Sequence, residues 1–185
     1  MIAYSISRPR RGSTKTASAT NISEPHWKLF NSVQRGEAVI DWIISNTRHN
    51  IPNDVLGPIF WKMLREQWSG FDRIDHYSYS RVFTRFRPYW SPQPEWSRLP
   101  ERLEVWRGGD RDSVRNGLSC TLERSVAENF AEGYRVPNKY PTLLRAEIDR
   151  SEVALVDDSR EEHEVVLFGP LLDRAQLVPF TVTRP

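Results

Sequence analysis

The order of apolar and polar residues predicts two helices in the first half of the chain. Residues 26–46 place apolar side chains at alternating steps of four and three, which is the spacing of one helix face. A second run with this spacing starts near Gly57, with Pro58 in its first turn, although Asn53 is the better capping residue. It ends at Gly70. We expect the two helices to pack on each other and on the sheet that follows.

Residues 71–100 interleave aromatic side chains with arginines, and prolines interrupt any long element. Such a segment can stack bases and hold phosphates, which would make it a nucleic-acid surface. It can also be a short helix or strand whose rings cover an edge of the core, with arginines stacked outward over them. We favour the second interpretation and treat nucleic acid as the weaker partner hypothesis.

After Pro100 the pattern changes to short β runs with a single helix among them. We expect the helix at 122–134, with Val126 and Phe130 on one face, and a loop at 133–141. We expect strands at 103–106, 117–121, 142–148, 153–156, 164–168 and 177–183. The predicted fold class is therefore α+β, with a helical N-terminal half packed on a β-rich, mixed sheet.

Length and composition favour one soluble domain. The 185 residues can hold a single core, and we expect the domain to span 24–185, with a helical part at 24–100 and a β-rich part at 101–185. The net charge of +2 indicates neither a nucleic-acid nor a membrane partner. Cys120 is the single cysteine, so no intramolecular disulfide can form, and the chain is compatible with a reducing cytosol.

The chain shows no targeting signal that would place it in a membrane. No apolar run is long enough to span a bilayer, and Met1 to Ile6 is too short for the core of a signal peptide. We expect a soluble protein that is cytoplasmic or delivered into a host cell.

Residues 1–23 are rich in Ser, Thr and Arg, and no acidic residue precedes Glu24. This segment has too little apolar surface to fold alone, so we expect a disordered basic tail. It could be a transit-peptide-like segment, an export signal of an injected effector, a weak phosphate-binding arm or an inert extension.

Carboxylates gather directly before a short apolar run at residues 165–168, which reads as a buried strand. Glu162 and Glu164 are two residues apart, so if the strand has begun by then they point to the same face, with His163 on the other. They form either a candidate acidic site or only the polar lead-in to a core strand.

Two further motifs precede these carboxylates in the chain. Arg107 ends a short apolar run before two glycines, and Ser119 and Thr121 form a Ser-x-Thr motif shortly after it. In this order, with Glu162-x-Glu164, the sequence resembles the mono-ADP-ribosyltransferases of the Arg-Ser-Glu class over residues 102–182. That class includes cholera-like and clostridial toxins, vertebrate ecto-enzymes and bacterial effectors.

The resemblance implies an enzyme that cleaves the bond between nicotinamide and ribose in NAD and transfers ADP-ribose to a protein side chain. It also implies an ADP-ribosyltransferase type of sheet. NAD would be the co-substrate, and the other partner would be an unidentified target protein. We expect a monomeric effector, toxin or phage-encoded modifier.

Each motif residue takes a role from the resemblance. Glu164 matches the glutamate that stabilises positive charge on the ribose. Glu162 matches the carboxylate that orients or deprotonates the acceptor, and its presence goes with arginine as the modified residue; Glu161 is the alternative. Arg107 matches the phosphate-binding arginine, and Ser119 matches the hydroxyl that holds the catalytic glutamate.

The remaining expected NAD contacts are less closely tied to a motif. Thr121 completes the Ser-x-Thr motif, and 133–140 falls where the family carries a loop over the nicotinamide ring. Phe130, Tyr134 and Tyr140 are candidate stacking partners, and Arg135 is a candidate phosphate contact.

The sequence departs from the family pattern at two positions. Trp106 stands where the family often has Tyr, and Cys120 replaces the middle Ser or Thr of the motif. Because Cys120 alternates to the other face of its strand, we expect it to be buried and inert. His26, His49, His76 and His163 have no metal-ligand spacing, so we assign no metal.

Two other functions remain open. Water could take the place of the acceptor, which would make the protein an NAD glycohydrolase. Alternatively, the chain could be a catalytically inactive binding module that keeps the fold and uses its Arg/aromatic segment for a partner.

Overall fold

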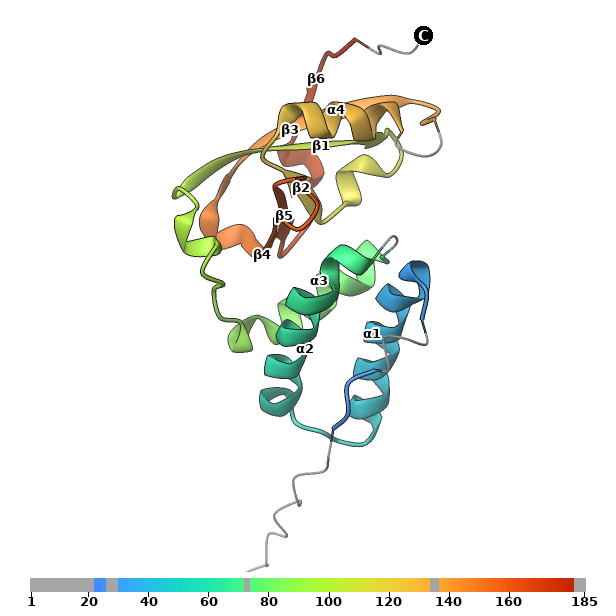
Figure 1. The fold of residues 1–185 in the computed structure, drawn as a ribbon, viewed down its shortest axis with the longest axis vertical. Coiled ribbons are helices and arrows are strands. Elements are labelled where there is room, and N and C mark those ends of the chain that lie inside the picture. Colours follow the sequence, from blue (N-terminus) through green and yellow to red (C-terminus); the bar gives the residue numbers. More distant parts are fainter. Residues whose placement is uncertain (1–21, 26–29, 72–73, 134–136, 182–185) are drawn as a thin grey trace, which may run out of the picture.

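The structure is a computed structural model that describes residues 22–25, 30–71, 74–133 and 137–181. Its described residues form an α+β fold in which three helices make one layer and six strands make an antiparallel sheet (Figure 1). The layer consists of α1 (Ser32–Arg48), α2 (Asn53–Gln67) and α3 (His76–Phe86). A fourth helix, α4 (Arg124–Glu132), lies across the sheet, away from this layer.

The helical layer is held together by apolar positions at helical spacing. In α2, Phe60 and Leu64 are fully buried, and in α3, Tyr79 and Phe83 are fully buried four residues apart. The Tyr79 hydroxyl also donates to the carbonyl of Gly36 in α1 at 2.8 Å, so the buried phenol has a partner. These residues pack the three helices into one aromatic-rich core.

Both predicted helix starts need correction. α1 begins at Ser32, because Asn31 and Gln34 form a reciprocal capping box there; residues 26–29 lie outside the described part. α2 begins at Asn53, so Pro58 sits inside the helix and Pro52 takes the cap position. Asn53 does not cap, since its side chain accepts hydrogen bonds from Arg85.

The segment after residue 71 contains a helix, α3, whose rings enter the core as we favoured. Tyr79, Phe83 and Phe86 are buried, whereas Tyr77 is 71% exposed. Arginine guanidinium groups lie over several of these rings, including Arg85 over Phe86 at 5.0 Å. Buried rings cannot stack on bases, which weakens the nucleic-acid interpretation.

The sheet has the strand order β4-β5-β2-β1-β3-β6, and every pairing is antiparallel. The expectation of a mixed sheet was therefore wrong. The strands are β1 (Arg102–Asp110), β2 (Ser119–Thr121), β3 (Pro141–Asp149), β4 (Val153–Asp157), β5 (Glu164–Leu167) and β6 (Gln176–Val178).

The strand bounds differ from the prediction, most of all in β1, β2 and β6, and β2 starts at Ser119 rather than at 117. β1 continues through both glycines to Asp110, because it pairs with β3 along its whole length. β6 ends at Val178, where Pro179 follows and cannot donate to the ladder. Residues 182 and 183 of the predicted last strand lie outside the described part.

The outer edge of β4 is covered by the segment that joins the two halves. The indole of Trp90 donates to the carbonyl of Ala154 at 2.7 Å, and Trp96 donates to that of Val153 at 3.0 Å. Gln93 pairs with both the N–H and the carbonyl of Val156. These side chains satisfy backbone groups that an open edge would expose.

Phe168, just after β5, joins the sheet to the helical layer. Its ring lies 5.8 Å from Trp61 and 5.5 Å from Trp90, and the Arg87 guanidinium lies 4.4 Å from its centre. One core cluster therefore contains residues of the three helices and of β4 and β5. A second cluster is formed mainly by residues of the sheet, and a third lies under α4.

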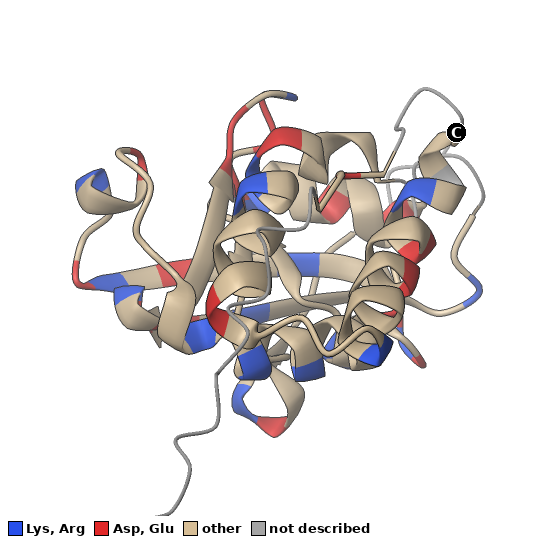
Figure 2. Ribbon diagram, turned by 90° about the horizontal axis from the view of Figure 1, so that it is seen from below, with Lys and Arg blue, Asp and Glu red and all other residues tan. Residues whose placement is uncertain are grey.

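Two residues of the predicted tail contact the helical layer. Ile22 packs against the helical core, and Ser23 accepts a hydrogen bond from Trp42 at 2.9 Å, so the predicted tail is attached at residues 22 and 23. Residues 1–21 lie outside the described part. Residues of both charge signs occur on the helical half and on the sheet (Figure 2). Among the described residues, no helix is long and apolar enough to cross a membrane.

The contact between β1 and α4 leads to the first prediction. A Cβ on Gly108 would lie 1.7 Å from the carbonyl oxygen of Ala127 and 2.5 Å from the nitrogen of Ala131, both in the backbone of α4. Gly108→Ala must therefore push α4 off the sheet, and we expect it to lower the free energy of unfolding by about 1–3 kcal/mol in urea titrations. Gly109→Ala is the control, since its Cβ would meet Val114 at 3.5 Å, an ordinary contact. Equal stability of the two variants would contradict this packing.

Candidate functional site

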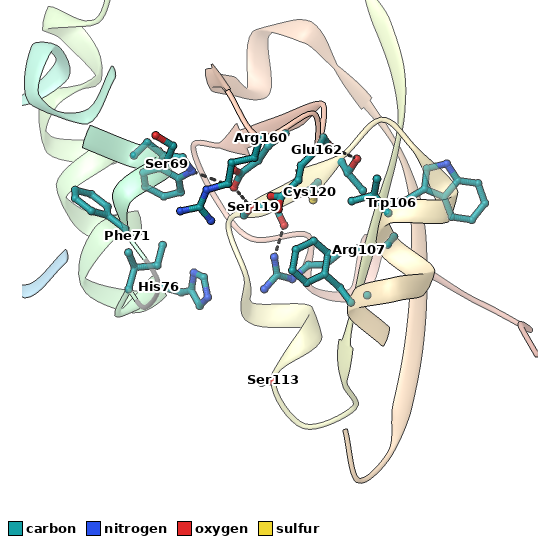
Figure 3. Close-up of a pocket in the computed structure, with 18 residues that line it drawn as sticks. Ser69, Phe71, His76, Trp106, Arg107, Ser113, Ser119, Cys120, Arg160 and Glu162 are labelled. Atoms are coloured by element: carbon teal, nitrogen blue, oxygen red, sulfur yellow. Dashed lines mark hydrogen bonds between the residues drawn. The ribbon is translucent and has the colours of Figure 1, made fainter. Parts of the chain in front are cut away.

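A cavity of about 670 Å³ lies between the helical layer and the sheet. Its size is within the range of small-molecule sites. The sheet side contributes Arg107, Ser119 and Glu164 from three strands. The helical side contributes Trp68, Ser69, Phe71, Ile74 and His76, and Figure 3 shows His76 and Phe71 facing the strands across the cavity. The three motifs, far apart in the sequence, therefore meet around one cavity.

Glu164 is placed by the pairing of β2 with β5. Ser119 pairs with Val166 in this register, which makes Glu164 its diagonal neighbour on the same face. The Ser119 hydroxyl donates to Oε1 of Glu164, and the indole Nε1 of Trp68 donates to the same oxygen at 3.0 Å. Both donors use Oε1, and no described residue has a hydrogen bond to Oε2. The second oxygen is therefore available to a ligand.

The environment of Glu164 disfavours its charge. Burial raises the pKa of this carboxyl above its ordinary value, and the nearby carboxylates of Asp157 and Glu162 raise it further. The hydrogen bonds from Ser119 and Trp68 act in the opposite direction because they stabilise the ionised form. A carboxyl group in a cleft whose pKa is shifted by burial and by specific partners is typical of a functional site.

Arg107 lies inside β1 rather than at the end of a short strand. Its Nε donates to the carbonyl of Val114 at 2.8 Å, and its Nη1 donates to that of Ser119. Burial lowers the pKa of the guanidinium, and the charge of Glu164 raises it. The side chain is therefore fixed by backbone groups, with Nη2 free of any described hydrogen bond (Figure 3).

Only one of the two candidate carboxylates in the loop before β5 lies at the cavity. Glu162 lines the cavity, whereas Glu161 is exposed and does not. Glu161 and His163 both have positive φ, at 57° and 45°, so the backbone turns sharply on each side of Glu162. β5 starts only at Glu164, which means that strand alternation does not set the direction of Glu162.

Thr121 borders the cavity, and its hydroxyl is used within the protein. Its hydroxyl donates to the carbonyl of Glu162 at 2.6 Å and accepts from the N–H of Glu123 at 3.0 Å. Thr121 therefore holds the Glu162 loop against the turn into α4.

The other predicted residues are only partly gathered at the cavity. Phe130 of α4 lines it and is 38% exposed. Tyr140 lies outside the lining, between Arg111 and Lys139. Tyr134 and Arg135 lie outside the described residues. Cys120 is buried, as expected, and burial raises the pKa of its thiol to about 12, which favours the protonated thiol at neutral pH.

Sequence reasoning missed the helical side of the cavity. From its spacing, Trp68 belongs to the apolar face of a helix. The same spacing would be found whether or not its indole donates to a carboxylate 96 residues away, so it does not reveal this hydrogen bond. His76 was considered only as a metal ligand. Its Nδ1 accepts from the N–H of Leu118 at 3.3 Å. No signal in one sequence links these residues to the sheet.

In the part of the chain that the structure describes, no three His, Cys, Asp or Glu side chains are grouped so that they could hold a metal ion. Comparison of the chain with protein-family models, with curated proteins and with solved structures finds no match. Functional inference therefore rests on the motifs and on the geometry of the cavity.

A tight contact beside Arg107 gives the second prediction. A Cβ on Gly117 would lie 1.8 Å from Cζ of Arg107 and 1.9 Å from its Nη2. The backbone of Gly117, at φ −72° and ψ 146°, suits alanine, so any effect must be steric. We expect Gly117→Ala to displace the guanidinium and to lower the free energy of unfolding by about 1–3 kcal/mol in urea titrations. Gly169→Ala, which places its Cβ in open space, should have little effect.

The pKa of Glu164 gives the third prediction. Trp68→Phe keeps an aromatic ring and removes the indole donor, so the ionised carboxylate loses stabilisation and the pKa of Glu164 should rise further. A ¹³C NMR titration of the glutamate carboxyl groups measures this as a midpoint moved to higher pH. Trp90→Phe is the matched control, because that indole donates to a backbone carbonyl instead. A Glu164 midpoint that stayed in place or fell in Trp68→Phe would contradict the assigned hydrogen bond.

Proposed function

We propose that this protein is an NAD-dependent mono-ADP-ribosyltransferase that modifies a protein side chain, with arginine as the acceptor. One observation carries the proposal: Arg107, Ser119 and Glu164, from three separated motifs, line one cavity, and the Ser119 hydroxyl donates to the Glu164 carboxylate. The family that the motif order resembles implies the same hydrogen bond, from the first hydroxyl of its Ser-x-Thr motif to its catalytic glutamate. A cavity of about 670 Å³ with both a fixed cation and a carboxylate suits a dinucleotide.

The proposed reaction breaks the bond between C1′ of the ribose and the nicotinamide nitrogen. Nicotinamide leaves with the electron pair of that bond, and positive charge develops on the ribose. The ionised carboxylate of Glu164, held through Oε1, stabilises this charge, and its Oε2 can accept a hydrogen bond from a ribose hydroxyl. Because Ser119 and Trp68 fix the carboxylate beforehand, little reorganisation is needed when the charge appears.

Glu162 supports transfer to an amine-like acceptor rather than to water alone. A guanidinium nitrogen of the acceptor attacks C1′ as nicotinamide leaves, and its proton passes to the Glu162 carboxylate. A carboxylate also pairs well with a planar guanidinium, which favours an arginine side chain. Arg107, with its always-charged guanidinium, is proposed to hold a phosphate of NAD.

The fourth prediction tests this chemistry with NAD labelled in the adenylate part and with a small guanidino compound as acceptor. Glu164→Ala should lower both NAD cleavage and transfer by about 10²-fold or more, because it removes charge stabilisation at the reacting centre. Glu162→Ala should lower transfer by a similar factor and spare hydrolysis of NAD. Glu161→Ala, a neighbouring exposed carboxylate, is the control and should stay active.

The outcomes separate the competing functions. Label on an acceptor supports a transferase, whereas free ADP-ribose without labelled acceptor indicates a glycohydrolase. Intact NAD in all reactions would leave a binding module. A fully active Glu164→Ala variant would remove Glu164 from its proposed role.

A further inference from the structure

His76 lies opposite Arg107 on the helical side of the cavity (Figure 3). It is the first residue of α3, and Asp75 caps that helix by accepting from the N–H of Tyr77 at 3.1 Å. The cap and the buried Tyr79 place the backbone of His76, and a hydrogen bond from the N–H of Leu118 holds its ring. His76 is therefore a positioned part of the cavity wall, although it belongs to no motif.

The tautomer of His76 follows from its hydrogen bond to β2. The N–H of Leu118 donates to Nδ1 at 3.3 Å, so Nδ1 must carry a lone pair and the ring proton sits on Nε2. None of the described residues accepts a hydrogen bond from Nε2. The ring thus offers one neutral N–H donor at the cavity.

Burial and the charge of Arg107 keep the ring of His76 neutral. Burial lowers the pKa of His76 to about 4, the charge of Arg107 on β1 lowers it as well, and Asp75 acts weakly in the opposite direction. Glu164, Glu162 and Arg160 line the same cavity from the other side. At neutral pH His76 therefore adds no charge of its own, and the positive charges at the cavity are the guanidinium groups of Arg107 and Arg160.

We propose that His76 and Arg107 form one phosphate subsite, in which Nε2–H of His76 and the guanidinium of Arg107 donate to the same phosphate group of the nucleotide. The inference deepens the proposed function and rests on it. Arg107 already gives Nε and Nη1 to backbone carbonyls, so it has Nη2 left for a ligand. A phosphate oxygen accepts from several donors, and a neutral second donor adds a hydrogen bond without placing two cations side by side.

This arrangement gives the helical half a direct part in ligand binding. The sheet supplies the cation and the carboxylates, and α3 supplies the second phosphate donor. A phosphate-containing ligand should therefore contact both halves of the domain, whereas nicotinamide alone needs no contact with His76.

The fifth prediction uses isothermal titration of ADP-ribose and of nicotinamide at pH 8 and pH 6. His76→Phe should weaken ADP-ribose binding by roughly 10-fold or more, the loss expected for one hydrogen bond to a charged group. His76→Gln keeps an N–H donor near the place of Nε2 and should stay within a few-fold of the wild type. Nicotinamide affinity should be unchanged in both variants. His49→Gln is the matched control, because His49 is an exposed histidine directly after α1 and does not line the cavity.

The pH dependence distinguishes a neutral donor from a cationic one. With His76 neutral, wild-type affinity for ADP-ribose should change little between pH 8 and pH 6, because its pKa near 4 lies below this range. In ¹⁵N NMR, ADP-ribose should shift the Nε2–H signal of His76 in the wild-type protein. That readout does not depend on any variant folding correctly.

Several results would overturn the subsite. The subsite is wrong if ADP-ribose does not bind to the wild type, or if it binds His76→Phe as tightly as the wild type. It is also wrong if His76→Phe weakens nicotinamide binding as much as ADP-ribose binding. A neutral donor is wrong if the affinity for ADP-ribose rises strongly toward pH 6 only when His76 is present. Failure of the proposed function looks different. ADP-ribose that binds in a His76-dependent way, with no cleavage or transfer from NAD, would support the subsite and reject the chemistry.

Discussion

A carboxylate removed from water must receive hydrogen bonds, and this requirement connects the two halves of the molecule at Glu164. The side chain stands at the start of β5, where burial opposes its charge. Ser119 from the neighbouring strand and Trp68 from the end of α2 both donate to one of its oxygens. The cavity exists where the helical layer and the sheet meet around this group. If the layer moved away, Glu164 would lose a donor and the cavity would lose one wall.

Backbone pairing sets the rest of the site. The short β2–β5 ladder places Ser119 diagonally opposite Glu164, and Thr121 ties the loop of Glu162 to the turn before α4. Arg107 is fixed by two carbonyls, that of Ser119 in β2 and that of Val114 in the segment between β1 and β2. Positions defined by ladders and backbone carbonyls vary little, which is the preorganisation that charge stabilisation requires.

The chemistry of the cavity combines opposite charges at fixed places. Carboxylates stand on the β5 side, the guanidinium of Arg107 stands on β1, and the neutral imidazole of His76 lies across from it. A ligand with an anionic part and a part that becomes positive matches this distribution. The proposed NAD chemistry has both features, since the phosphates are anionic and the ribose gains positive charge as nicotinamide leaves.

The sequence by itself determined the elements that depend on local pattern and the residue types of the candidate site. Helical spacing predicted α1, α2 and α4, and apolar runs located the strands, because burial of one face imposes these periods. The tertiary structure alone decided strand direction: β4 and β5 are almost continuously apolar, as in a parallel sheet, yet they are antiparallel and are covered by the helical layer instead. It also decided where α2 starts, since Leu56 is buried before Pro58, and which side chains join the motif residues. Trp68 and His76 reach the site only through packing between segments that are distant in the sequence. Such contacts produce no periodic pattern of residues, so a single sequence does not predict them.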